Sequence, residues 1–119
     1  SVKSDIPLTP DCGFYNAHKL MKEGCIVWLY EKGFHHTKII TVDGQFCTVG
    51  SANLNARSLR WDREENAVII DACTTHELDN LFEAQKKDSF KLTETKWKQW
   101  RTPWQRFRGW FAHLLSPFL

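Results

Sequence analysis

Apolar positions recur at two different spacings along the chain, and the spacings predict helices at both ends with strands between them. Asp11 suits the start of the first helix, and Gly24 suits its end. The apolar residues between them fall on one helix face: Phe14, Ala17, Leu20 and Met21. The nearly continuous apolar run at 25–30 then indicates a strand that is buried on both faces.

Three further strands and a helix follow in the middle of the chain. Residues 38–42 and 45–49 flank the dipeptide Asp43-Gly44, a strong turn signal, and therefore predict a β-hairpin. The apolar segment 66–70 predicts another buried strand, and residues 76–87 carry helical spacing.

Thr75 is available as the N-cap of that second helix. The order helix, strand, hairpin, strand, helix predicts an α/β domain in which a sheet is layered with flanking helices.

The C-terminal segment has a different composition from the body of the chain. Glu94 is the last acidic residue, and five basic residues follow it within a short distance: Lys96, Lys98, Arg101, Arg106 and Arg108. Thr102-Pro103 fits the start of an amphipathic helix over residues 103–115. One narrow arc collects the apolar side chains: Trp97, Trp100, Trp104, Phe107, Phe111, Leu114, Leu115 and Phe118.

Two interpretations of this apolar arc remain open. A basic helix with Trp, Phe and Leu on one face is suited to the interface of an anionic membrane. The same face could instead pack on the domain or on a missing partner half. In either case we divide the chain into residues 1–95 and a basic, Trp-rich segment at 96–119.

Length and composition exclude several classes of protein. A chain of 119 residues with 42% hydrophobic content supports one small domain, and a net charge of +2 is too small to indicate a nucleic-acid partner. The four cysteines form no CxxC pair, so a zinc knuckle is not expected, and no apolar run is long enough to span a bilayer. The chain begins at Ser1 without a signal-peptide pattern, which we interpret as a piece of a longer protein or a mature product.

One segment carries the candidate chemistry. In this segment an HxK pattern is followed after four residues by an aspartate, and after six more residues by GSxN. The specified residues are His36, Lys38, Asp43, Gly50, Ser51 and Asn53. At usual residue frequencies, six fixed positions match by chance about once in 10⁷ to 10⁸ starts.

The spacing of these residues suits attack on a phosphodiester. His36 and Lys38 would project from the same face of a strand, the imidazole as nucleophile and the ammonium as a clamp for the phosphate oxygens. The hairpin would return Ser51 and Asn53 to the start of that strand as hydrogen-bond donors. Asp43 is out of phase with these residues and should point to the other face.

The motif resembles the signature of the phospholipase D superfamily. Residues 50–59, GSANLNARSL, are similar to the GSANLDxRS stretch of bacterial cardiolipin synthases; Arg57-Ser58 is the informative pair, and Asn55 stands where Asp is usual. The end of the chain, 114–119, resembles the LLSPLL-type terminus of those enzymes. The resemblance covers the chain from about residue 11 onwards and implies the C-terminal part of a phospholipase D-like domain.

The resemblance also implies roles for individual residues. In the family, the residues at the positions of His36, Lys38 and Asn53 contact the phosphoryl group, and the histidine forms a phosphohistidine. Asp43 would form a salt bridge or a turn. A glutamate before the next strand accepts a hydrogen bond from the imidazole, and Glu65 fits that position best, with Glu64 as the alternative.

The implied reaction is transphosphatidylation, in which two phosphatidylglycerol molecules give cardiolipin and glycerol without a metal or a nucleotide. A complete site combines two such motifs, so a second motif-bearing half is expected upstream in the same protein or in a second subunit, and this piece alone should be inactive. The implied location is the bacterial cell membrane, with peripheral attachment or anchoring through segments absent from this chain. Alternative functions are a nuclease or other phosphodiesterase of the superfamily and a non-catalytic membrane-interaction module.

Overall fold

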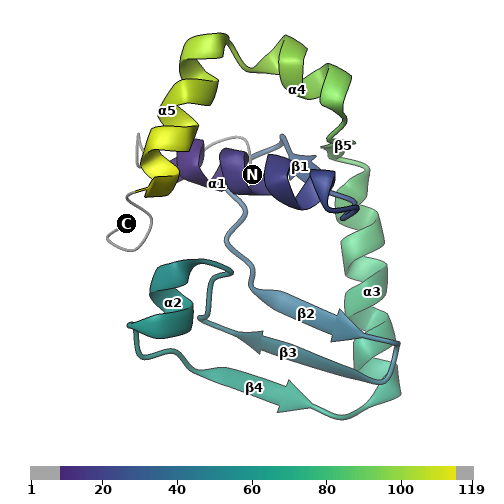
Figure 1. Ribbon diagram of the computed structural model, residues 1–119. Helices are drawn as coiled ribbons and strands as arrows, with labels where there is room; N and C mark the ends of the chain where they lie inside the picture. Colours follow the sequence, from purple (N-terminus) through teal and green to yellow (C-terminus); the bar gives the residue numbers. More distant parts are fainter. Residues whose placement is uncertain (1–8, 115–119) are drawn as a thin grey trace. The chain divides into compact units, whose positions relative to one another are not determined.

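The computed structural model describes residues 9–114 as a mixed α/β structure, which confirms the predicted fold class (Figure 1). The elements are α1 (Thr9–Lys22), β1 (Trp28–Tyr30), β2 (Ile39–Val42), β3 (Phe46–Gly50), α2 (Ala56–Arg60), β4 (Asn66–Ile69), α3 (Ala72–Lys86), β5 (Ser89–Lys91), α4 (Glu94–Trp100) and α5 (Pro103–Leu114).

These elements form two compact units. Of the described residues, the helical unit combines 9–34 with 88–114, and the hairpin unit comprises residues 35–87. The boundaries of the compact units differ from the division at residue 95 that the sequence suggested. A functional division at that position stays a prediction.

The core of the helical unit forms where α1 and α4 meet the two-stranded sheet β1–β5. The strands are antiparallel, with Leu29 opposite Phe90. Leu29, Leu92 and Trp97 are buried together with Phe14 from α1. The ring of Trp100 meets the ring of Phe14 edge to face at 4.8 Å between centroids, a favourable aromatic geometry.

Asp11 has a different position from the one predicted. The helix already begins at Thr9, so Asp11 lies within the first turn and is buried rather than acting as the N-cap. Its carboxylate accepts hydrogen bonds from the guanidinium groups of Arg101 and Arg108. Arg101 is buried as well, and its charge also lies over the rings of Phe14 and Trp100. This ion cluster ties α1 to the C-terminal segment.

The end of α1 agrees with the sequence-based expectation. Gly24 has a φ of +95°, the left-handed region that glycine enters without a steric penalty. The Gly24 amide donates to the carbonyl of Met21, and the Cys25 amide donates to the carbonyl of Leu20. This pair of bonds is the Schellman motif, which satisfies carbonyl groups at a helix end.

Helices α1 and α5 pack directly on each other (Figure 1). Gly109 is buried at this contact, and a Cβ atom added there would lie 2.8 Å from the carbonyl oxygen of Asp11 and 3.2 Å from the Cβ of Tyr15. The absence of a side chain at Gly109 therefore permits the close approach of the two helices.

The hairpin unit contains an antiparallel sheet in the order β2–β3–β4, and α3 packs against β2 and β3. Asp43 and Gly44 have φ values of 51° and 65°, and the Gln45 amide donates to the carbonyl of Val42. Two consecutive positive φ values identify a type I′ turn, the geometry that Asp-Gly favours in hairpins. The predicted hairpin is confirmed.

Other boundaries in this unit were predicted incorrectly. Helix α3 begins at Ala72, where the Asp71 carboxylate caps it by accepting from the Thr74 amide at 2.7 Å; Thr75, the predicted cap, is fully buried inside the helix. The strand β4 is not buried on both faces, since Val68 is 64% exposed. It forms an edge of the sheet, so its apolar side chains do not receive neighbours on both sides.

The sequence analysis also misplaced or omitted short elements. The strand expected at 25–30 begins only at Trp28, and Cys25 and Ile26 are exposed. Helix α2 and strand β5 were not predicted, because segments of five residues or fewer carry too little periodicity.

The C-terminal segment forms two helices instead of one continuous apolar stripe. Thr102 starts α5 with a reciprocal capping box: the Gln105 amide donates to the Thr102 hydroxyl, and the Gln105 side chain accepts from the Thr102 amide. The predicted helix at 103–115 is therefore confirmed through Leu114; Leu115 and Phe118 lie outside the described residues. In the described residues, no helix has the length and apolar character needed to cross a bilayer.

The two halves of the predicted stripe have different environments. Trp97 of α4 is buried and Trp100 packs against the core of the helical unit. The α5 members Trp104, Phe107, Phe111 and Leu114 are at least half exposed. Packing on the domain thus accounts for the tryptophans of α4, whereas the apolar face of α5 has no cover in the described chain.

We predict that Asp11→Asn lowers the free energy of unfolding of the helical unit by about 3–5 kcal/mol, because it leaves the buried Arg101 charge without its partner. Urea unfolding of the intact protein, followed by tryptophan fluorescence, measures this change, since every tryptophan except Trp61 lies in the helical unit. Glu23→Gln, at an exposed position, should leave the midpoint unchanged. Equal midpoints for Asp11→Asn and the wild type would contradict the assignment.

Candidate phosphate-binding site

The motif of residues 36–53 is arranged around the open end of the β2–β3 hairpin. Lys38 immediately precedes β2, and Gly50 is the last residue of β3. The Gly50 amide donates to the carbonyl of Lys38 at 3.2 Å, which extends the ladder by one bond beyond β2. Residues 50–53 therefore return beside the start of the first strand, as the sequence predicts.

Lys38 and Asn53 line the same pocket, which has a volume of about 340 Å³. Its other polar side chains include Thr37, Thr48 and Asn66. Its apolar wall is formed by Ile39, Ile40, Leu54 and Leu59. An ammonium group and amide groups above an apolar wall suit a phosphate group that is attached to an apolar substituent.

His36 lies two residues before Lys38, and its side chain is exposed. Its carbonyl oxygen accepts a hydrogen bond from the Lys38 ammonium at 2.9 Å. The imidazole does not line the pocket that Lys38 and Asn53 share. The structure thus brings the cation and the amide together, and the convergence of the imidazole with them stays a prediction.

The expectation that His36 and Lys38 both belong to a strand is wrong, since β2 begins at Ile39. The reason is found in the opposite strand. The Ser51 amide donates to the carbonyl of Glu65, and the Ala52 amide donates to the side-chain oxygen of Asn66. The Ala52 amide is therefore not available to meet the carbonyl of His36, which would be the next bond of the β2–β3 ladder past Lys38. The Ser51 amide belongs to the side of the strand that faces Glu65.

The loop that follows β3 is held tightly against the start of β4. The Ser51 hydroxyl accepts from the Glu65 amide at 3.0 Å, in addition to the backbone bond between the same residues. A Cβ atom added to Gly50 would lie 1.8 Å from Asn66 Oδ1 and 2.2 Å from the carbonyl oxygen of Glu65. The motif glycine is therefore required for close approach of two backbones rather than for an unusual φ.

Glu64, rather than Glu65, places its carboxylate in this loop. Glu64 Oε2 accepts from the Ser51 hydroxyl at 2.5 Å. The pKa of Glu64 lies below its ordinary value, mainly because of the hydrogen bond from Ser51, then of one from Ser58; the Lys38 charge contributes less and desolvation opposes the shift. A low pKa keeps this carboxylate ionised beside the motif.

The period of a strand explains why Glu64 takes this position. Side chains alternate faces, so Glu64 lies on the same face as Asn66, whose side chain holds the Ala52 amide. Glu65 contributes its backbone groups, and its side chain is exposed. The sequence analysis placed Glu65 first and Glu64 second. Phasing both residues against Asn66 would have favoured Glu64. Which carboxylate assists the imidazole stays a prediction.

Ser51 and Asp43, two other motif residues, do not line the pocket that Lys38 and Asn53 share. The Ser51 hydroxyl donates to Glu64 and does not line the pocket. Asp43 occupies the hairpin turn, at the opposite end of β2 from Lys38, a separation of about 15 Å at the usual rise per residue. This position agrees with the Asp43-Gly44 turn signal and with the turn role that the resemblance implies.

Helix α2 supports the far side of the loop. The side chain of Asn55 caps α2 by accepting from the Ser58 amide at 2.8 Å, and Arg57 pairs with Asp62 at 3.0 Å. Asn and Asp are equally good N-caps. The Asn at a position where Asp is usual therefore retains the local function.

Metal ligands are not grouped in the described part of the chain: no cluster of three or more His, Cys, Asp or Glu side chains could hold an ion there. The chemistry that this site offers comes from a lysine, amides, hydroxyls and an ionised glutamate.

A hairpin that presents a lysine and an asparagine to one pocket is suited to binding a phosphate group. Residues 2–86 match the family model described as "Cardiolipin synthase, PLD-like domain". The chain therefore belongs to this family of phospholipase D-like domains.

Individual relatives support the same assignment. The chain is 34% identical to a cardiolipin synthase of Listeria welshimeri over 99% of its own length and 26% of the relative. It is 35% identical to the minor cardiolipin synthase ClsB of Bacillus subtilis over 99% of its length and 29% of the relative. The chain thus spans about a quarter of the length of these curated relatives. No solved structure matches it significantly.

We predict that Gly50→Ala destabilises the hairpin unit by about 1–3 kcal/mol, because the new methyl group would collide with backbone atoms of β4 that cannot rotate away. Gly33→Ala is the matched control, since an added Cβ there meets no atom within 4 Å. Hydrogen exchange at the Ser51 and Ala52 amides of the intact protein measures the effect. Equal protection in both variants would contradict it.

We also predict that Ser51→Ala raises the pKa of Glu64 toward the ordinary glutamate value of about 4.3. A lowered pKa in the folded state stabilises the fold at pH values above the ordinary pKa of the unfolded chain. This contribution is lost as the pH falls through the lowered pKa. The stability difference between wild type and variant should therefore be full at neutral pH and shrink below about pH 4. Carbon NMR of the Glu64 carboxyl gives the titration; an unchanged curve would contradict the prediction.

Proposed function

We propose that this chain is the C-terminal, motif-bearing part of a cardiolipin synthase and that it acts at the bacterial cell membrane. The observation that carries the proposal is the shared pocket of Lys38 and Asn53, two motif residues fifteen positions apart. The family membership and the names of the relatives support the same reaction.

The proposed reaction transfers a phosphatidyl group between two phosphatidylglycerol molecules. A histidine nitrogen attacks the phosphorus of the first lipid, forming an N–P bond as the P–O bond to glycerol breaks; a general acid supplies the proton with which glycerol leaves. A hydroxyl group of the second phosphatidylglycerol then gives its proton to a base and attacks the phosphohistidine. The N–P bond breaks, and cardiolipin is released with the histidine regenerated.

The described residues have distinct tasks in this proposal. The Lys38 ammonium and the Asn53 amide hold the non-bridging oxygens, whose charge grows in the transition state. Ile40, Leu54 and Leu59 give the pocket an apolar wall for the parts of the lipid next to the phosphate. The Glu64 or Glu65 carboxylate orients the His36 imidazole and stabilises its protonated form.

The reaction needs a second proton-transferring group in addition to His36. We propose that a second motif-bearing half supplies it, either from the same protein or from a second subunit. His36 is then the nucleophile or the general acid, and the partner histidine takes the other role. Anionic lipid is the proposed surface on which both halves work, and the exposed apolar face of α5 supports this choice.

We expect His36→Ala in the intact protein to reduce synthesis of cardiolipin from labelled phosphatidylglycerol at least a hundredfold, since general acid–base groups contribute about 10² to 10⁴ and nucleophiles more. A denaturing quench at alkaline pH, with lipid labelled at phosphorus, separates the two roles. If His36 is the general acid, the variant should accumulate an acid-labile, base-stable phosphoenzyme. If His36 is the nucleophile, no phosphoenzyme should form in the His36→Ala variant.

His76→Gln serves as the matched control, because His76 belongs to the same unit but lies at the turn end of the hairpin, beside Gly44. It should retain wild-type activity. Unchanged lipid turnover in His36→Ala would refute the proposal. Cleavage of DNA by the wild type, lost in His36→Ala, would assign the chain to the nucleases of the superfamily instead. Lipid binding without any turnover would leave only a membrane-interaction module.

A further inference from the structure

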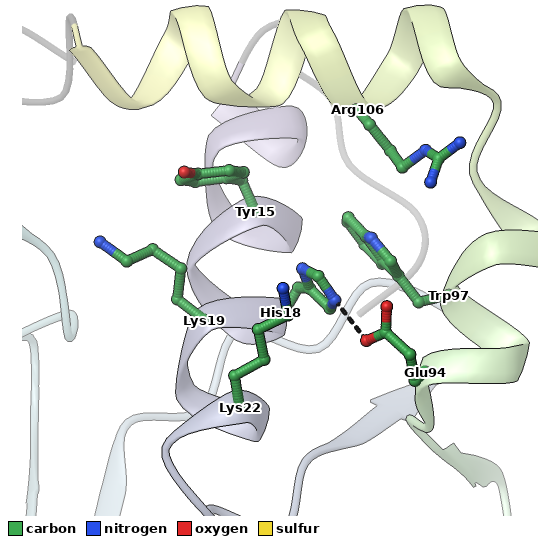
Figure 2. Close-up of a pocket in the computed structure, with 7 residues that line it drawn as sticks. All are labelled: Tyr15, His18, Lys19, Lys22, Glu94, Trp97 and Arg106. Atoms are coloured by element: carbon green, nitrogen blue, oxygen red, sulfur yellow. Dashed lines mark hydrogen bonds and ion pairs between the residues drawn. The ribbon is translucent and has the colours of Figure 1, made fainter.

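A second pocket, with a volume of about 280 Å³, is located in the helical unit between α1 and the C-terminal helices (Figure 2). Its first wall is one face of α1, where Tyr15, His18, Lys19 and Lys22 recur at helical spacing. Glu94 and Trp97 of α4 and Arg106 of α5 complete it. The motif residues of the hairpin unit take no part in this pocket.

The charge of this pocket is strongly positive. Lys19, Lys22 and Arg106 face a single carboxylate, that of Glu94. Glu94 is already paired, with His18 at 2.8 Å and with Lys98 at 3.7 Å. Lys19, Lys22 and Arg106 form no ion pair within 4.0 Å to any described residue.

The hydrogen bond with His18 also fixes the charge of Glu94. It lowers the pKa of Glu94 from its ordinary value, with smaller contributions from the charges of His18, Lys98 and Lys22, while desolvation opposes the shift. Glu94 is therefore ionised at neutral pH, and an uncompensated excess of cations remains around the pocket. Such an excess is suited to a ligand with negative charge.

The wall between the cations is rigid. The His18 ring stacks on the Trp97 ring at 4.5 Å between centroids and 11° between planes (Figure 2 shows both rings). Trp97 is only 3% exposed, so core packing holds this stack in place. The cationic side chains are thus arranged around a preformed surface, which reduces the entropy lost when a ligand binds.

The neighbouring face of α5 is apolar and uncovered. On a helical wheel, Gly109 and Ala112 mark the side that packs on α1, and both are buried. The opposite side carries five large exposed side chains: Trp104, Phe107, Trp110, Phe111 and Leu114. Arg106 lies at the boundary between these two sides, so the cationic pocket and the apolar face adjoin on one helix.

We propose that this pocket binds the headgroup phosphate of an anionic phospholipid while the apolar face of α5 inserts into the surrounding bilayer interface. The pocket would be a lipid site separate from the site of the motif. It requires no catalysis by the hairpin unit, so its failure and the failure of the proposed reaction can be distinguished.

Charge complementarity favours an anionic lipid over other occupants. Residues 95–119 contain no acidic residue, so no carboxylate of this segment opposes the positive charge around the pocket. Amphipathic helices bind where aromatic side chains reach the boundary between headgroups and acyl chains and cations meet phosphates. A soluble phosphate compound would use the pocket but leave the apolar face of α5 in water.

The first test uses the intact protein and dihexanoylphosphatidylglycerol below its micelle concentration. We expect a saturable change in the NMR signals of the Trp97 indole and the His18 ring. The double variant Lys22→Gln with Arg106→Gln should bind this lipid at least tenfold more weakly. Lys91→Gln with Lys96→Gln removes the same charge at exposed positions outside the pocket and should bind within about twofold of the wild type, because a charge near an anionic lipid matters most at short range.

A variant that should raise the affinity for the lipid makes the test independent of folding defects. Glu94→Gln removes the one carboxylate among the described residues that line the pocket and should bind the lipid more tightly, by up to about fivefold for one charge. Loss of affinity in both Glu94→Gln and the cation variant would indicate structural damage and would overturn the proposal. Thermal unfolding of all variants checks that the helical unit remains folded.

The second test separates a lipid from a free phosphate and from diffuse surface charge. Binding to vesicles of phosphatidylglycerol and phosphatidylcholine should fall about tenfold more in the pocket variant than in the Lys91 and Lys96 control. Equal losses would overturn the proposal in favour of a nonspecific basic surface. Inorganic phosphate that binds as tightly as dihexanoylphosphatidylglycerol would overturn the lipid assignment, and so would binding to pure phosphatidylcholine vesicles at the same strength.

Discussion

The close passage of β3 against the start of β4 is the constraint on which the hairpin unit depends. Gly50 has no room for a side chain, because Asn66 and the carbonyl of Glu65 occupy the space of a Cβ atom. The same contact orders the loop from Ser51 to Asn53 and carries Asn53 to the pocket of Lys38. A close backbone contact thus determines where the side chains of Lys38 and Asn53 meet.

Sequence reasoning identified the features that depend on local chemistry. The Asp43-Gly44 turn and the end of α1 at Gly24 are set by residues that accept positive φ, and the sequence displays such residues directly. The exposure of β4 and the ion pairs of Asp11 depend on which distant segments meet, and no local pattern encodes that. In the sequence, an aspartate near the start of a helix, such as Asp11, looks like an N-cap. Its pairing with Arg101 and Arg108 becomes apparent only in the folded structure.

The phospholipase D-like motif was easier to recognise than the geometry of its members. Fixed spacing identified Lys38 and Asn53, which do line one pocket. It could not decide between Glu64 and Glu65, because neighbouring residues in a strand differ only in the face to which they point, and that choice depends on where pairing begins. The pairing of Gly50 with Asn66 sets the phase of this segment and accounts for the position of the Glu64 carboxylate beside Ser51.

The β1–β5 ribbon has a consequence for how this chain acquires its structure during synthesis. Tyr30 pairs with Ser89, so the helical unit is closed by segments that flank the whole hairpin unit. The contacts within residues 35–87 are short in sequence, whereas the helical unit has to wait until residue 114 is made. High contact order slows folding. The nascent chain therefore completes the three-stranded sheet of the hairpin unit before the β1–β5 ribbon closes, so this sheet folds ahead of the unit whose segments flank it in the sequence.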